Sequence, residues 1–192
     1  MTGNSRGNRC LLAGSAALLT TALVGATPSE AWPSTTSRPA HDVAPTRQLD
    51  GDVGPRSAYN GRCLDADLNQ IGHNGTKVQL WDCIPGAANQ RWILTTFGDG
   101  TSTIKSVRSG RCLDADLNHI GHNGTRVQLW DCYSTYSHQR WILRDYNPDG
   151  TFRIINVRSR RCLDADLNHI GGNGTPIQLW NCLPGAANQR WR

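Results

Sequence analysis

Apolar and polar side chains alternate in a short segment that occurs three times along the chain. In its second copy, Val127 and Leu129 fall on one face of an extended chain. Gln128 and Trp130 fall on the opposite face, and an Asn123-Gly124 turn pair precedes the segment. This pattern predicts short strands that bury one face and are joined by tight turns.

Four strands are expected in each copy. In the second copy they cover residues 103–107, 112–114, 126–132 and 139–143. The third copy contains only the beginning of its fourth strand, so the three copies predict twelve short strands. An all-β, closed three-fold barrel suits this set better than a linear solenoid, because no terminal unit differs from the rest.

A longer motif sets the length of the repeat. The segment 62–69 returns at 111–118 and at 161–168. Each copy then carries Gln-Leu-Trp, a second cysteine 20 residues after the first, and Gln-Arg-Trp. Regular recurrence of this kind indicates one supersecondary unit multiplied. We therefore divide the folded part into repeats at about 55–100, 101–150 and 151–192.

Composition excludes several classes of protein. The 192 residues include 20 glycines, seven tryptophans and one methionine, and every acidic residue except Glu30 is aspartate. Such a chain does not suit a helical bundle, and it lacks the paired glutamates of most glycosidases. The net charge of +5 comes from basic residues without a run of five or six, so no nucleic-acid partner is expected.

The first 54 residues differ from the repeats. Arg6 and Arg9 precede a short apolar run at 11–25 and then small residues, which predicts a secretory signal peptide at 1–31 and a secreted, extracellular protein. The run is too short for a membrane span. Residues 32–54 are rich in Pro, Ser and Thr and are expected to be a linker to the domain at 55–192.

The combined motifs resemble a known family. Three copies of Cys-Leu-Asp, Gln-Leu-Trp-x-Cys and Gln-x-Trp resemble the ricin-type (ricin B-like) β-trefoil lectins and carbohydrate-binding modules over residues 55–192. The resemblance implies a β-trefoil and a secreted lectin-like module that binds galactose- or xylose-containing glycans or polysaccharides. Up to three repeat-related sites, no catalysis and no cofactor are expected, and the protein is expected to be a monomer.

The repeats contain six cysteines, an even number typical of a disulfide framework. Their equal spacing favours one bridge in each repeat, and the family resemblance implies the same pairing. The expected bridges are Cys63–Cys83, Cys112–Cys132 and Cys162–Cys182. Zinc binding is a competing interpretation, which the lack of a Cys-x-x-Cys motif disfavours.

The six tryptophans of the repeats fall into two classes. The resemblance places the Trp of each Gln-Arg-Trp in the core: Trp92, Trp141 and Trp191. The Trp of each Gln-Leu-Trp shares a strand face with a glutamine. It suits either packing or a platform for the apolar face of a sugar ring, and in the family it stacks on the sugar.

Polar residues complete the predicted sites. An aspartate two residues after the first cysteine can fix sugar hydroxyls through charge-assisted hydrogen bonds, with turn capping as the alternative. By resemblance, the Asn before the last Gln donates to the sugar and that Gln supports the aspartate. The carbohydrate-binding residues are predicted to be Asp65, Gln79, Trp81, Asn89 and Gln90; Asp114, Gln128, Trp130, His138 and Gln139; and Asp164, Gln178, Trp180, Asn188 and Gln189.

The second copy departs from this pattern. His138 stands where the other copies have Asn, and its neighbourhood changes from one with Pro-Gly-Ala-Ala to one that contains Tyr133 and Tyr136. We therefore rank this site below the other two. The loop at 68–72, one residue longer than in plant toxin lectins, is expected to rim the pocket and leaves the choice of sugar open.

Other interpretations compete with sugar binding. The series Asp65, Asp67 and Asn69 imitates the start of a calcium loop, but Gln70 and Thr76 stand where a glycine and a carboxylate belong. We expect no metal site. Asp65 and Asp67, which are separated by one residue, do not provide the distinct acid and base that an enzyme needs. The Asn-Gly-Thr triplets are formal glycosylation sequons or simple hairpin turns.

The alternative function is a protein-interaction or toxin/adhesin-type trefoil without functional sugar sites.

Overall fold

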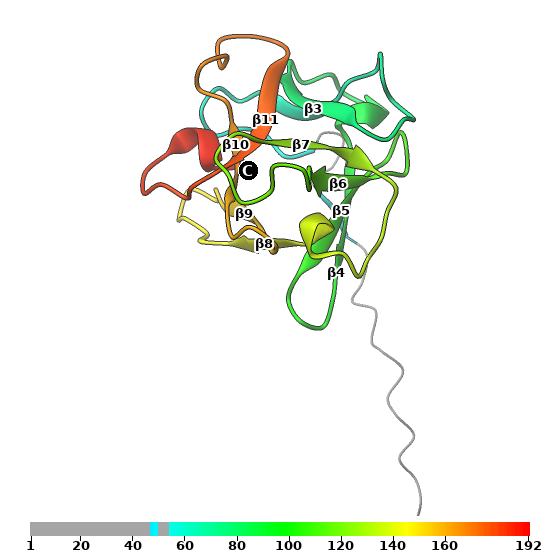
Figure 1. Cartoon of the computed structure of the whole chain (residues 1–192). Coiled ribbons are helices and arrows are strands. Elements are labelled where there is room, and N and C mark those ends of the chain that lie inside the picture. The colour runs from blue at the N-terminus through cyan, green and yellow to red at the C-terminus, as the bar shows by residue number, and fades with distance from the viewer. Residues whose placement is uncertain (1–46, 50–53) are drawn as a thin grey trace, which may run out of the picture. The chain divides into compact units, whose positions relative to one another are not determined.

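A computed structural model describes residues 47–49 and 54–192. The predicted signal peptide and most of the predicted linker lie outside the described residues. The described part is all-β apart from three single-turn 3-10 helices (Figure 1). The elements are β1 (Arg47–Leu49), β2 (Cys63–Ala66), β3 (Thr76–Trp81), η1 (Ala88–Gln90), β4 (Trp92–Thr96), β5 (Ser102–Ser106), β6 (Cys112–Ala115), β7 (Thr125–Trp130), η2 (Ser137–Gln139), β8 (Trp141–Arg144), β9 (Arg153–Asn156), β10 (Cys162–Ala165), β11 (Thr175–Trp180) and η3 (Ala187–Gln189).

Antiparallel pairing follows the three repeats. Each repeat contains one hairpin of its second and third strands, β2–β3, β6–β7 and β10–β11. Pairs β4–β5 and β8–β9 join consecutive repeats. The third strands β3, β7 and β11 also pair with one another, and they lie together at one end of the fold (Figure 1). This arrangement is the predicted β-trefoil.

The predicted twelve strands are present in two forms. Ten are the strands β2 to β11. The other two are the short segments at 56–57 and at Trp191, which pair only through isolated bridges: Arg56 with Cys63, and Trp191 with Ser57 and Phe152. The bridge between Ser57 and Trp191 joins the first repeat to the last and therefore closes the barrel.

The core forms from the apolar faces of these strands and confirms one class of tryptophan as structural. Trp92, Trp141 and Trp191 are fully buried. Each indole N–H donates to a backbone carbonyl of its own repeat, and the N···O distances are 3.0, 3.1 and 3.2 Å. Because the polar atom is satisfied, the ring buries its whole area without an unpaired donor.

The three expected disulfides are formed: Cys63–Cys83, Cys112–Cys132 and Cys162–Cys182. In each bridge one cysteine begins the second strand and its partner follows the third strand by two residues. The pairing leaves none of the six cysteines as a zinc ligand.

Two strand boundaries of the second repeat were predicted two residues away from their actual place, and the others within one residue. Gln139 was expected to begin a strand but lies in η2, because its side chain bonds within its own turn, with Tyr133 N–H donating to its amide oxygen at 2.7 Å. Strand β7 was expected to reach residue 132 but ends at Trp130. There Asp131 N–H donates to the side chain of Asn74 from another repeat instead of a neighbouring strand.

The predicted linker also contains structure. Its residues 47–49 form β1, which pairs with β4. Gly54 is buried, and its N–H donates to Gln90 O at 2.9 Å. A Cβ at this position would lie 2.3 Å from that oxygen. Only glycine allows so close an approach, so the domain includes residue 54, one residue before the predicted boundary.

The Asn-Gly-Thr triplets form contacts between repeats. Asn74 donates to the Asp131 carboxylate at 2.8 Å, and Asp82 N–H donates to Asn173 Oδ1 at 2.7 Å. Asn123 accepts the Asn181 N–H at 2.8 Å. Each repeat therefore binds the next in a closed cycle. The glycines of the triplets have φ angles of 85–89°, in the left-handed region that the predicted tight turns require.

Candidate functional site

A buried carboxylate lies at the centre of each repeat's candidate site. In site 1 (Asp65, Gln79, Trp81, Asn89 and Gln90), Asp65 is only 3% exposed. Gln79 lies opposite Asp65 in the β2–β3 hairpin and donates to its Oδ1 at 3.1 Å. Asn89 and Gln90 donate to Oδ2 at 2.8 and 2.9 Å from η1. The hairpin and the 3-10 turn thus hold the carboxylate from two sides.

The bonding leaves one oxygen of Asp65 open. An ionised carboxylate offers about four acceptor positions; Oδ2 uses two and Oδ1 uses one. One position on Oδ1 remains for a ligand hydroxyl. Burial raises the pKa of Asp65, while the hydrogen bonds from Gln79 and Gln90 act in the opposite direction. A ligand hydroxyl that donates here would add a further bond to the charged form.

Gln90 is a positioning residue as well as a donor. It is fully buried, and its amide nitrogen also donates to Asp82 O at 2.9 Å. Its amide oxygen accepts the Ile84 N–H at 2.8 Å. One side chain therefore ties Asp65 to the loop that follows the Trp81 strand.

Asn89 uses its amide donors within the protein, which differs from the expected role of donor to the sugar. Both of its amide hydrogens are used, one by Asp65 Oδ2 and one by Ala66 O at 3.2 Å. The remaining atom, Oδ1, is an acceptor. Site 1 therefore offers two acceptors to a ligand, Asp65 Oδ1 and Asn89 Oδ1, and suits a ligand that supplies hydroxyl donors.

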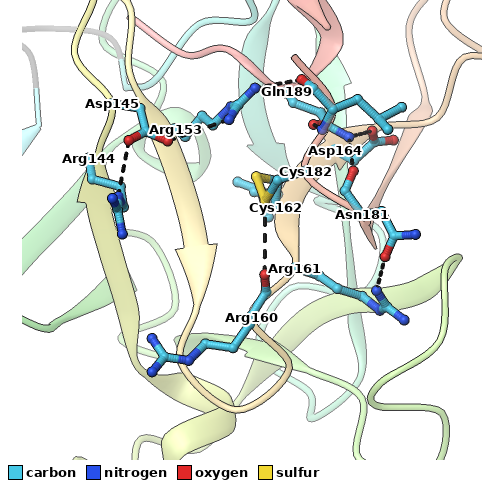
Figure 2. Close-up of a disulfide and its surroundings, with 12 residues drawn as sticks. Arg144, Asp145, Arg153, Arg160, Arg161, Cys162, Asp164, Asn181, Cys182 and Gln189 are labelled. Carbon is cyan, nitrogen blue, oxygen red and sulfur yellow. Dashed lines mark hydrogen bonds and ion pairs between the residues drawn. A yellow bond between two sulfur atoms is a disulfide. The ribbon is translucent and has the colours of Figure 1, made fainter.

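Site 3 (Asp164, Gln178, Trp180, Asn188 and Gln189) repeats this geometry. Gln178 donates to Asp164 Oδ1 at 3.0 Å, and Asn188 and Gln189 donate to Oδ2 at 2.8 and 2.9 Å. Figure 2 shows Gln189 and Asp164 next to the Cys162–Cys182 disulfide. Burial raises the pKa of Asp164 as it does in site 1.

The strand tryptophans lie at the surface beside these carboxylates. Trp81 is 37% exposed and Trp130 is 38% exposed, whereas the core tryptophans are fully buried. Trp180 is partly exposed. Leu68 from the long loop lines the pocket of site 1 as expected, and so does Ile84. The 640 Å³ cavity of site 1 therefore combines apolar side chains with polar ones, among them Asp65 and Arg108.

Site 2 (Asp114, Gln128, Trp130, His138 and Gln139) keeps two of the three donors. Gln128 donates to Asp114 Oδ1 at 3.2 Å and Gln139 donates to Oδ2 at 2.9 Å. The third partner is His138, whose Nε2 lies 3.3 Å from Oδ2. Burial lowers the pKa of His138 and raises the pKa of Asp114.

Aromatic rings change the shape of site 2. Tyr133 and Tyr136 stack with their centroids 4.9 Å apart, and Tyr136 lies 5.3 Å from the His138 ring. The tyrosines occupy the positions of Ile84 and Ala87 in site 1. The cavity is smaller, at 470 Å³, and it has aromatic side chains on two sides.

Some lining residues come from the neighbouring repeat and were missed by the sequence analysis. Arg108 of the second repeat lines site 1, and Gly75 of the first repeat lines site 2. No motif within one repeat could have identified them. The only signal in the sequence is that the turns carrying these residues recur at the same spacing in every repeat.

The competing chemistries find little support in the described part of the chain. The carboxylate of Asp67 caps its own turn by accepting the Asn69 N–H at 3.0 Å, and the other two repeats do the same. Among residues 54–192 no group of three or more His, Cys, Asp or Glu side chains is arranged to hold a metal ion. No helix in the described residues is long and apolar enough to cross a membrane.

Comparisons with known proteins agree with this geometry. The model of the ricin-type beta-trefoil lectin domain matches residues 51–191. A search of curated proteins found no match. Among solved structures, the designed three-fold symmetric protein ThreeFoil is 27% identical, with a TM-score of 0.65 over 72% of this chain and 94% of its own.

Two natural lectins share the fold. The Macrolepiota procera ricin B-like lectin in complex with lactose is 20% identical, with a TM-score of 0.61 over 76% of this chain and 92% of its own. The earthworm R-type lectin C-half in complex with GalNAc is 24% identical, with a TM-score of 0.54 over 72% of this chain and 93% of its own.

Proposed function

The chain belongs to the ricin-type beta-trefoil lectin domain family, and from this we propose that it is a secreted, non-catalytic protein that binds galactose- or xylose-containing glycans or polysaccharides. The observation that carries the proposal is the pairing, in each repeat, of a carboxylate held by amide donors with a tryptophan at the surface. Such a pair offers a sugar ring an apolar platform and an acceptor for its hydroxyls.

The proposed sugar class rests on the chemistry of site 1 and on the neighbours. Asp65 Oδ1 and Asn89 Oδ1 both accept, so adjacent hydroxyls of one ring can donate to them while its apolar face lies on Trp81. Two of the structural neighbours are complexes with lactose and with GalNAc, and both ligands contain a galactose-type ring.

The described contacts argue against catalysis at these sites. Acid–base catalysis by a carboxyl group requires a second, differently tuned group nearby. In site 1 the carboxylate of Asp65 is occupied by three amide donors, and Asp67 caps a turn. Three disulfides support secretion, because such bridges persist in oxidising environments.

We expect each site to bind weakly and the three sites to act together on a polymer. A rigid body with three sites raises the effective concentration at the second and third sites once the first is bound. A monomer suffices for this effect, so the proposal requires no assembly.

Retention on galactose-based and xylan matrices tests the proposal. We expect the triple variant Trp81→Ala, Trp130→Ala, Trp180→Ala to lose retention while it keeps the fold of the parent, as circular dichroism can check, because none of these rings belongs to the buried core. Asp65→Ala, Asp114→Ala and Asp164→Ala together should also abolish retention. Undiminished retention of both triple variants would refute carbohydrate binding at these sites.

A further inference from the structure

The turn that follows the first strand of each repeat lies against the site of the preceding repeat. Val107 N–H donates to Arg91 O at 3.0 Å, and Val157 N–H donates to Arg140 O at 2.9 Å. Ala58 N–H donates to Arg190 O at 2.9 Å and completes the cycle. The next residue in each turn therefore occupies an equivalent place beside site 1, site 2 or site 3.

These three equivalent residues differ in charge. Arg108 stands beside site 1, Arg158 beside site 2 and Tyr59 beside site 3, and all three side chains are exposed. Arg108 lines the same cavity as Asp65 and Trp81.

Two observations place Arg158 at site 2. Asn156, in the same turn as Arg158, donates to His138 O at 3.0 Å. The charge of Arg158 also contributes to lowering the pKa of His138, after the larger effect of burial.

Neither arginine has an acidic partner. Within residues 54–192, the ion pairs and side-chain hydrogen bonds include neither the Arg108 nor the Arg158 guanidinium, whereas Arg111 and Arg140 both pair with aspartates. The aspartates that line the cavities are engaged elsewhere. Asp65 and Asp114 accept amide donors, and Asp67 and Asp116 cap their own turns.

We propose that Arg108 and Arg158 form an anion-binding rim, so that sites 1 and 2 bind a sugar more tightly when it carries a carboxylate or a sulfate ester beside the ring that stacks on the tryptophan. Site 3, with Tyr59 at the equivalent position, has no such preference. A guanidinium donates two parallel hydrogen bonds to either anionic group. This inference rests on the proposed carbohydrate binding and adds the substrate class of two of its sites.

Matched polymers test the inference. Binding of the chain to a glucuronoxylan is compared with binding to the same polymer after reduction of its carboxyl groups, and a sulfated galactan is compared with its desulfated form. The first pair probes the carboxylate and the second probes the sulfate ester. We expect tighter binding to at least one anionic form, and a preference that falls as salt rises from 50 to 500 mM, about the range over which screening becomes strong.

Variants assign the preference to individual residues. Arg108→Gln with Arg158→Gln should reduce the ratio of anionic-form binding to neutral-form binding about three- to tenfold per site. The control Lys105→Gln with Arg144→Gln removes the same charge from residues that line neither cavity, and it should leave the preference intact. In a chain with Asp65→Ala and Asp114→Ala, only site 3 remains, and Tyr59→Arg should create the preference there.

Each outcome has a separate meaning. Equal binding to charged and neutral forms would overturn the anionic rim and leave carbohydrate binding standing. Binding to neither form of any polymer would overturn the proposed function itself. If the control variant lost the preference to the same extent, the cause would be the total charge of the protein, and the inference would be overturned.

Discussion

Sites 1 and 2 share one scaffold but differ in a single donor to the carboxylate. In site 1 the donor is Asn89, at 2.8 Å from Asp65, and in site 2 its place is taken by His138, at 3.3 Å from Asp114. The aspartate is 3% exposed in both. The glutamines common to both sites therefore fix the carboxylate, and the Asn or His position is free to vary the ligand.

The largest expected effect tests this role of the glutamines. Gln90→Ala and Gln139→Ala should each lower the free energy of unfolding by about 3 kcal/mol, because each takes one donor from a buried carboxylate and leaves a carbonyl and an N–H without a partner. Urea denaturation measures the loss. Gln70, which is exposed, provides the control, and Gln70→Ala should change stability by less than about 0.5 kcal/mol.

Different losses of unfolding free energy at the two glutamines would contradict this shared role. A loss at Gln139 much smaller than the loss at Gln90 would mean that His138, and not the shared glutamine, holds Asp114.

A smaller effect is expected when the surface tryptophan of site 1 or site 2 is removed, and its size should differ between the two sites. Trp81→Ala removes the main aromatic surface of site 1, and we expect a loss of sugar affinity of about tenfold, near 1.4 kcal/mol. Trp130→Ala should cost less, because Tyr133 and Tyr136 also line site 2. Calorimetric titration of chains in which only one site is intact measures both values. A larger loss at Trp130 would show that the tyrosines do not contact the sugar.

The smallest effect concerns pH. The folded state lowers the pKa of His138 through burial, so the unfolded chain binds its proton more readily. The stability that this residue contributes is present above its unfolded pKa, about 6.5, and is lost as pH falls through the lower folded value.

Urea denaturation at pH 7.5 and pH 5 measures this contribution. We expect the parent to lose stability relative to His138→Asn on acidification, by less than the effect of removing a glutamine. An equal or opposite change in the two proteins would contradict the assignment.

Features that repeat within the chain could be predicted from sequence. The alternation around Val127 and Leu129 predicts the strands, and the equal cysteine spacing agrees with the bridges that the family resemblance implies. The buried position of Trp141 also followed from the resemblance. These features arise inside one repeat, so periodicity and local motifs carry the information.

Contacts between repeats could not be predicted. The place of Arg108 beside site 1 and the bond from Asp131 N–H to Asn74 depend on how the barrel closes. The orientation of the Asn89 amide depends on the backbone carbonyl of Ala66, which no spacing reveals. The strand β1 was missed because it lies outside the three repeats, although it pairs with β4.

The stoichiometry of sugar binding tests the central claim most directly. Calorimetric titration of the chain with lactose and with a xylo-oligosaccharide should give three sugars per chain for at least one ligand, in line with the three buried carboxylates Asp65, Asp114 and Asp164. Asp65→Ala, Asp114→Ala and Asp164→Ala should each remove one. Absence of binding to both sugars, or a stoichiometry that none of the three substitutions changes, would contradict the claim.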